Sequence, residues 1–154
     1  MDRRGLQAVV AALARLSDGS GQDFSPSSTL LELAEDTGKS SVIRSLALHS
    51  VKVDHPGLKV GKLVALAQAD DLALQREAIR ALALHPDADR ESALATVAAD
   101  ASIRAGLRAD AIAGLAPFAT GQSDLLKKLS KDKNKVVSSE AIRTLASAGL
   151  MQRE

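Results

Sequence analysis

Cysteine, tryptophan and tyrosine are absent from this chain of 154 residues, and Phe24 and Phe118 are its only aromatic residues. Without cysteine the chain has no disulfide bonds and no thiolate metal ligands, and its compartment stays open. A core without aromatic rings must be filled by Ala and Leu, which are strong helix formers. Runs of alternating β-branched and aromatic residues, which mark strands, are also absent. These absences favour closely packed helices.

A large net charge and long apolar runs are absent too. The net charge is +1, which gives no whole-protein argument for binding nucleic acid or an anionic membrane. The longest apolar runs, such as Leu63–Ala67, are far shorter than the roughly 18 residues that span a bilayer. No signal-peptide pattern follows Met1. We expect a globular chain with no membrane partner, cytoplasmic if complete and periplasmic if it is a fragment of a larger protein.

One apolar pattern, Ile or Val followed by x-x-Leu-Ala, occurs five times. The copies begin 33, 36, 33 and 30 residues apart and lie at Val10–Ala14, Ile43–Ala47, Ile79–Ala83, Ile112–Ala116 and Ile142–Ala146. Positions i, i+3 and i+4 share one helical face, so each copy predicts an amphipathic helix. Repeats of this length stack on one another to build a shared core. Leu82 and Leu115 are therefore expected in that core.

A second apolar segment and an acidic turn precede four of the copies. The segments are Leu30–Leu33, Leu63–Leu66, Leu94–Val97 and Leu125–Leu129, and the turns carry Asp36, Asp70 and Asp71, Asp100, and Asp132. Each unit thus predicts a helix A, a turn and a helix B, with the aspartate accepting hydrogen bonds from the start of helix B. Prolines 26, 56 and 86 suit the first turns of A helices, and Gly149 suits a position just after the last helix.

The Leu-x-x-Leu helices, the turn aspartates and the second helices of the form [LV]-x-x-[ED]-A-I-[RA]-x-L-A resemble the HEAT-repeat family, particularly its short phycobilisome-lyase type. The resemblance covers roughly residues 25–148 and implies an all-α, right-handed superhelix with B helices lining a concave face. We expect one domain over 1–154: an N-terminal capping helix in 1–24, four A–B repeats in 25–148, and a tail in 149–154. The first helix is expected to cap the array or to lack its partner helix. A shortened turn before Ile43 and a glycine at 114 depart from the pattern.

Charged residues recur at fixed places in the B helices. Arg44, Arg80 and Arg143 each follow the first apolar residue of a copy, whereas Glu77, Asp110 and Glu140 each lie two residues before it. Two interpretations stay open: a solvated face laced by weak salt bridges, or a groove that binds an acidic protein or peptide. The second interpretation makes these six residues the candidate partner-binding set.

A basic cluster and two histidines complete the candidate residues. The cluster consists of Lys127, Lys128, Lys131, Lys133 and Lys135 and predicts either a solubilising surface or a contact with phosphates. His49 and His85 each end a Leu-Ala-Leu-His segment, where a helix dipole favours histidine. A metal or haem site there is disfavoured, because zinc sites need three or four ligands. No cofactor and no catalytic residue is expected.

The function predicted from these patterns is a non-enzymatic scaffold or protein-binding module. One alternative follows from the family resemblance: a repeat segment of a larger bacterial protein that also carries dehydrogenase or c-type cytochrome domains. The chain itself lacks Cys-x-x-Cys-His and so cannot attach haem covalently. The weaker alternative is nucleic-acid backbone binding through the lysine cluster.

Overall fold

The computed structural model describes Gly5, Ala8 and residues 26–151. Within residues 26–151 it contains only helices, so the predicted all-α class is confirmed there. Apart from Gly5 and Ala8, the helix predicted in residues 1–24 lies outside the described residues. The helices are α2 (Pro26–Glu35), α3 (Ser41–Ser50), α4 (Val60–Ala67), α5 (Leu72–Leu84), α6 (Arg90–Ala99), α7 (Ala105–Gly114), the short 3-10 helix η1 (Ala116–Phe118), α8 (Ser123–Leu129) and α9 (Lys135–Ser147).

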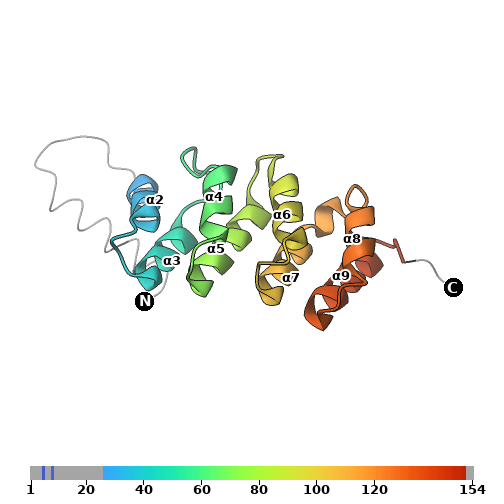
Figure 1. Cartoon of the computed structure of the whole chain (residues 1–154). Coiled ribbons are helices and arrows are strands. Elements are labelled where there is room, and N and C mark those ends of the chain that lie inside the picture. The colour runs from blue at the N-terminus through green and yellow to red at the C-terminus, as the bar shows by residue number, and fades with distance from the viewer. Residues whose placement is uncertain (1–4, 6–7, 9–25, 152–154) are drawn as a thin grey trace, which may run out of the picture.

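The eight α-helices of residues 26–151 form two rows in an elongated array (Figure 1). The A helices α2, α4, α6 and α8 make one row, and the B helices α3, α5, α7 and α9 make the other. Each B helix packs against the A helix of its own pair and against the B helix of the next pair. The core therefore runs lengthwise between the rows, and each helix is buried both by its partner in the pair and by the neighbouring pairs.

The A helices repeat one short apolar pattern. Leu30, Leu63, Leu94 and Leu126 are all fully buried, and each is followed three residues later by another Leu or Val. Because these positions are i and i+3, they lie on one side of the helix and face the B row. The four predicted A segments are confirmed as helices.

The B helices share one pattern of buried residues, but in α3 this pattern falls on other residues than the sequence predicted. Ala78, Ile79 and Leu82 of α5 are buried, and so are Ala111, Ile112 and Leu115. In α3 the buried set is Ala47, Leu48 and Val51, whereas Ile43 is exposed. The alignment of Ile43 with Ile79 was therefore wrong by five residues, because two overlapping stripes fit the same spacing and burial selects the second. The expected burial of Leu82 and Leu115 is confirmed.

The turn aspartates act in two ways. Asp71 accepts a hydrogen bond from the backbone N–H of Leu74, 3.0 Å away, and caps α5 as expected. Asp36, Asp100 and Asp132 instead accept from the backbone N–H two residues further on. Those donors, which belong to the turns, are Gly38, Ser102 and Asn134. Turns 36–40, 100–104 and 130–134 are longer than turn 68–71. Their aspartates therefore lie too many residues before the next helix to cap it. The expected shortened turn before α3 is also wrong, since 68–71 is the shortest.

The His-Pro loops connect consecutive pairs. The ring of His85 is buried: its Nε2 donates to the carbonyl oxygen of Leu58 at 2.7 Å, and its Nδ1 accepts from the backbone N–H of Asp87 at 3.1 Å. His55 repeats the arrangement with Gly57, and its Nε2 lies 3.3 Å from the hydroxyl of Ser28. The counterpart of His85 is therefore His55 and not His49, which lies inside α3. Pro56 and Pro86 lie in these loops, ahead of the first turns of α4 and α6.

Gly149 ends α9 as predicted. Its φ of 69° is a left-handed conformation that favours glycine. The backbone N–H of Gly149 donates to Ala146, and that of Leu150 donates to Leu145. This pair of bonds is the Schellman arrangement, which satisfies carbonyl groups that the helix end leaves open.

Candidate partner-binding site

Four equivalent positions form a line along the B row once α3 is aligned by its buried residues. They hold His49, Arg80, Ala113 and Arg143, and the positions three residues earlier hold Leu46, Glu77, Asp110 and Glu140. We call the surface made by these two lines the B-helix face. It contains five of the six predicted partner-binding residues and adds His49, which the sequence alignment had misplaced.

Acidic residues hold the cations of this face in place. The guanidinium Nε of Arg80 lies 2.6 Å from Glu77 Oε2, and His49 Nδ1 lies 3.0 Å from the same oxygen. Glu77 therefore joins α3 to α5. Arg143 pairs with Glu140 within α9 at 2.5 Å, and the Arg143 side chain is 71% exposed. Ion pairs of exposed side chains add little stability, so Arg143 can exchange its partner at small cost. The pair of Arg80 and Glu77 is half-buried, with side chains that are 34% and 24% exposed.

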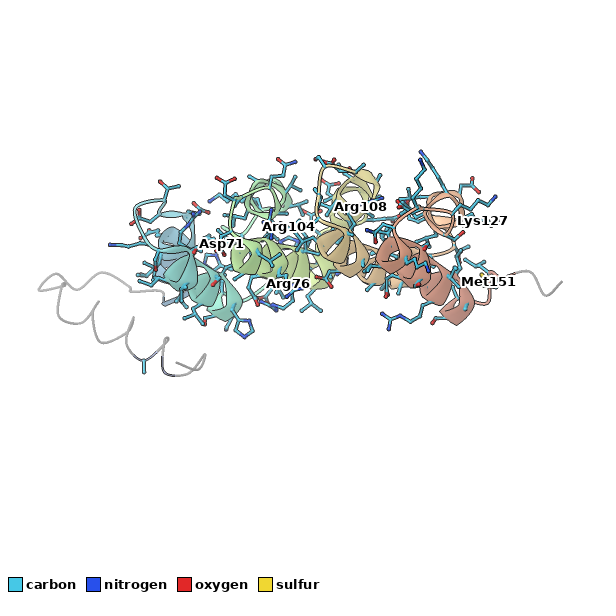
Figure 2. All side chains as sticks on the ribbon, turned by 60° about the horizontal axis from the view of Figure 1, so that its bottom comes forward. Asp71, Arg76, Arg104, Arg108, Lys127 and Met151 are labelled. Atoms are coloured by element: carbon cyan, nitrogen blue, oxygen red, sulfur yellow. The ribbon has the colours of Figure 1, made fainter. Side chains whose placement is uncertain are left out.

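Arg76 belongs to the same face and was missed by the sequence analysis. Its Nε lies 3.7 Å from Asp110 Oδ2, and this ion pair links α5 to α7. Figure 2 labels Arg76 on the array. Burial raises the pKa of Asp110; the charge of Arg76 opposes that rise and the charge of Glu140 adds to it. The charges of Asp110 on α7 and Glu140 on α9 therefore influence each other. The signal for Arg76 in the sequence was weak, because no other B helix has a cation at that position.

Two grooves open along this face. One, of about 540 Å³, lies between α5 and α7; Ile79, Ala83, Ala113 and Gly114 are among its lining residues, as are the charged residues Arg76, Glu77, Arg80 and Asp110. The second, of about 400 Å³, lies at the ends of α3 and α5, with His49, Arg80 and the exposed Leu84 in its lining. Arg80 lines both grooves.

Gly114 lies in the lining of the first groove, where the helices pack closely. A Cβ at this residue would lie 3.0 Å from the Cβ of Ala83 and 3.2 Å from a methyl group of Leu94. Glycine therefore lets α7 approach α5 and α6 closely. The glycine that departed from the sequence pattern is a packing requirement at the centre of the array.

Arg44 does not lie on the B-helix face. Its Nε donates to the carbonyl oxygen of Ala34 at 3.0 Å, at the end of α2. Arg108 makes the same bond to Ala98 at 2.9 Å, so Arg44 and Arg108 are equivalent. Grouping Arg44 with Arg80 and Arg143 was an error that followed from the five-residue misalignment of α3.

Arg44 and Arg108 define a second charged surface, which we call the turn edge, together with the turn aspartates. Arg108 also donates to Asp132 of the next pair at 2.8 Å, and the two side chains are only 8% and 20% exposed. Hydrogen bonds from Asn134 and Arg108 lower the pKa of Asp132. Hydrogen bonds from Leu74 and Ser41 lower the pKa of Asp71, and the charge of Arg44 adds to that effect. Figure 2 labels Asp71, Arg104 and Arg108.

The equivalent of Arg44 and Arg108 in α5 is Gln75. Its Oε1 is buried and accepts no hydrogen bond from any described residue. The second A–B pair thus lacks the guanidinium found in the first and third pairs, and the fourth pair has Ser138 at this position. The sequence analysis missed the equivalence of Arg44, Gln75 and Arg108, because it had aligned α3 with the wrong residues of the other B helices.

The lysine cluster forms an exposed patch at the C-terminal end of the array. Lys127 and Lys128 lie on α8, Lys135 begins α9, and Lys131 and Lys133 lie in the turn between them. The carboxylate of Asp132, within the same turn, accepts a hydrogen bond from Arg108. The five ammonium groups therefore gather without a neutralising carboxylate from that aspartate.

Within residues 26–151, no three His, Asp or Glu side chains gather in a way that suits a metal ion. His49 contacts Glu77, and both ring nitrogens of His85 are engaged with backbone groups. The structure therefore does not bring these two histidines together. No helix in the described part of the chain has the length and apolarity needed to cross a bilayer.

Comparison with known proteins returns no match to a family model, a curated protein or a solved structure.

Proposed function

We propose that this chain is a non-enzymatic binding module, a right-handed α-solenoid of the HEAT-like type that holds a protein segment along its B-helix face. The observation that carries the proposal is the groove between α5 and α7, with apolar residues and charged residues both in its lining. Such a combination suits a peptide, because apolar contacts give affinity and a few placed charges fix orientation.

The line of cations is interrupted at one place, and that place is the groove. Arg80 and Arg143 occupy equivalent positions on α5 and α9, whereas α7 has Ala113 there. A long side chain at 113 would cover the floor made by Ile79 and Gly114. The short alanine leaves room for a partner's side chain between two arginines.

The partner's chemistry follows from this geometry. Packed helices lie about 8–10 Å apart, so Arg80 and Arg143 are separated by roughly 20 Å. An extended chain advances about 3.3 Å per residue, so about six residues span that distance. We expect a segment with a small apolar residue in its middle and acidic residues about three positions to either side. The partner's carboxylates would replace Glu77 and Glu140 as the ion-pair partners of Arg80 and Arg143. Each carboxylate would then accept two hydrogen bonds from one guanidinium.

A display selection with random peptides of ten residues tests the proposal. Selected peptides should carry two acidic residues about six positions apart. Ala113→Arg restores the missing cation, fills the groove at an exposed position, and should weaken binding of these peptides at least about tenfold. The double variant Arg80→Ala and Arg143→Ala should weaken it similarly and remove its dependence on salt.

Matched controls separate this face from the rest of the surface. Arg104→Ala removes an exposed cation from turn 100–104, and the double variant Lys127→Ala and Lys128→Ala removes two from the lysine patch. Neither should change peptide affinity. Equal affinity of Ala113→Arg and the unaltered protein would refute the groove as the binding site, as would failure to select any peptide.

A further inference from the structure

The first and third A–B pairs carry the same arginine bridge. Arg108 Nε donates to the carbonyl oxygen of Ala98 at 2.9 Å, and Arg108 Nη2 donates to Asp132 Oδ2 at 2.8 Å. Arg44 makes the same kind of bond to the end of α2, and its charge acts on Asp71. Each arginine therefore joins the C-terminal end of its own A helix to the acidic turn of the next pair.

The second pair, α4 and α5, has similar surroundings but no arginine. Gln75 occupies the position of Arg108, and Asp100 occupies the position of Asp132 in the next turn. Asp100 Oδ1 accepts two hydrogen bonds from Ser102, but no described residue donates to Asp100 Oδ2. The buried Gln75 Oε1 also lacks a donor among the described residues. Acceptors that an arginine would satisfy are therefore open at this pair.

A pocket of about 340 Å³ lies at this place. Its lining includes Gln75, Asp100 and Ser102, together with Gln68 and Asp70, which follow the end of α4. The last carbonyl groups of a helix carry a partial negative charge. Hydrogen bonds from Ser102 lower the pKa of Asp100, so its carboxylate is ionised at neutral pH. The pocket thus offers carbonyl and carboxylate oxygens to a cation.

One cation of the chain, Arg104, also belongs to the lining of this pocket. The side chain of Arg104 is exposed at the start of α7 and makes no hydrogen bond or ion pair with a described residue. It therefore disfavours a ligand that carries positive charge alone. It favours a ligand that also has a carboxylate.

From this comparison within one chain we propose that the pocket binds a guanidinium group supplied by another molecule. The group takes the place that Arg108 fills in the third pair, with N–H groups directed to Asp100 Oδ2 and to the carbonyls at the end of α4. The flexible Gln75 side chain turns its oxygen towards the group. A guanidinium presents its donors in a planar fork that reaches several acceptors at once, whereas an ammonium is a compact point charge.

Two sources supply such a group: a free guanidino compound such as L-arginine, or an arginine side chain of a protein. None of the residues in the lining of the groove between α5 and α7 belongs to this pocket. The inference therefore does not depend on peptide binding at the B-helix face.

Titration of the full, ¹⁵N-labelled chain followed by NMR tests the site. The probes are L-arginine, N-acetyl-arginine amide, which represents an arginine within a protein, and N-acetyl-lysine amide. Both arginine probes should give saturable shifts of the Ser102 and Ile103 backbone amides and of the Gln75 side-chain amide. The lysine probe should bind at least about tenfold more weakly. Equal binding of the lysine probe would overturn the assignment of a guanidinium, as would the absence of saturable shifts up to about 20 mM of either arginine probe.

The two arginine probes also distinguish the sources. Tighter binding of L-arginine that Arg104→Ala abolishes would support a free compound whose carboxylate pairs with Arg104. Binding of N-acetyl-arginine amide that is equal or tighter would support an arginine side chain of a protein.

Three variants locate the site. Gln75→Arg fills the pocket with the chain's own guanidinium and should weaken binding of both arginine probes at least about tenfold. Asp100→Asn keeps the size of the side chain, removes its charge, and should have the same effect. Ala73→Arg adds a cation at an exposed position of α5 outside the lining of the pocket and should bind like the unaltered chain. Circular dichroism melts establish that each variant is folded, and unchanged affinity in folded Gln75→Arg or Asp100→Asn would overturn the proposal.

Discussion

The turn edge and the B-helix face carry the same kinds of charged groups, but at different depths. Arg108 and Asp132 at the turn edge are largely buried, and each also bonds to backbone groups. Arg143 and Glu140 on the B-helix face approach just as closely, yet the arginine is mostly exposed and makes no other bond in the described structure. Distance alone therefore does not separate a structural ion pair from an exchangeable one. Burial and the number of bonds per group do.

Substitutions in the core should cause the largest losses of stability, against which the effects at both surfaces can be compared. Leu82→Ala removes a fully buried side chain and should lower the free energy of unfolding by about 2–5 kcal/mol in denaturant melts. Leu84→Ala, two residues away on the exposed side of α5, should leave it nearly unchanged. A loss below about 1 kcal/mol for Leu82→Ala would contradict the alignment of the B helices.

Removal of one arginine from each surface tests the comparison directly. Arg108→Ala leaves the carbonyl of Ala98 and the carboxylate of Asp132 without their partner in a largely buried place, and should destabilise the protein by about 3 kcal/mol. Arg143→Ala should lower the denaturant midpoint much less than Arg108→Ala, because Arg143 is 71% exposed and bonds to no backbone group, although Glu140 is only 15% exposed. Similar losses for both variants would mean that depth does not divide the two surfaces.

Glycine substitutions probe the groove without any charge. Gly114→Ala places a methyl group against Ala83 and Leu94 and should destabilise the fold by about 1 kcal/mol. Gly106→Ala lies in the same helix, has open space around its new Cβ, and should stabilise by about 0.5–1 kcal/mol. Thermal melts of the pair should move in opposite directions. If both rise, α7 is not held tightly against α5.

Acid should affect the two surfaces with opposite sign. The pKa values of Asp71, Asp100 and Asp132 are lowered, so their stabilising contribution is present above the ordinary aspartate pKa and is lost as the pH falls through their lowered values. The pKa of Asp110 is raised, so its ionised form is unfavourable at neutral pH and the penalty lessens as the pH falls.

Two isosteric variants measure this difference. Asp132→Asn should be less stable than the unaltered protein at pH 7, and the gap should close as the pH falls below the ordinary aspartate range. Asp110→Asn should be at least as stable as the unaltered protein at pH 7. Urea melts at several pH values provide the data, and parallel pH profiles for the two variants would show that the two surfaces do not differ electrostatically.

The smallest expected effect is a gain in the second A–B pair, α4 and α5. Gln75→Arg supplies the guanidinium that Arg44 and Arg108 supply elsewhere and places a donor among the C-terminal carbonyls of α4 and the carboxylate of Asp100. A gain of about 0.5 kcal/mol is expected. Ala73→Arg adds the same charge at an exposed site of α5 and should give no gain. Destabilisation by Gln75→Arg would mean that the shorter turn 68–71 cannot accept the larger side chain.

The sequence allowed prediction of the helices in residues 26–147 and of most core leucines, because their spacing depends only on local helical geometry. It misaligned α3 with the other B helices, since the apolar segments Ile43–Ala47 and Ala47–Val51 overlap and both fit a helical stripe. The more even series Ala47, Ala78, Ala111 and Ala141 was the available signal. Arg108 was not predicted at all, because a buried arginine is recognised only by the carbonyl and carboxylate that surround it.

The ring of His85 has a geometric consequence for the whole array. One ring nitrogen is hydrogen-bonded to Leu58 in the loop before α4, and the other to Asp87 in the loop before α6. The rigid imidazole ring therefore holds these two successive loops at a fixed distance. A rigid spacer at that point sets the tilt between neighbouring pairs. At the third loop the link is instead made by flexible side chains, with Arg90 over the ring of Phe118 and Gln122 bonded to Glu91. We therefore expect the first two loops to hold their helix pairs at a more fixed angle than the third loop does.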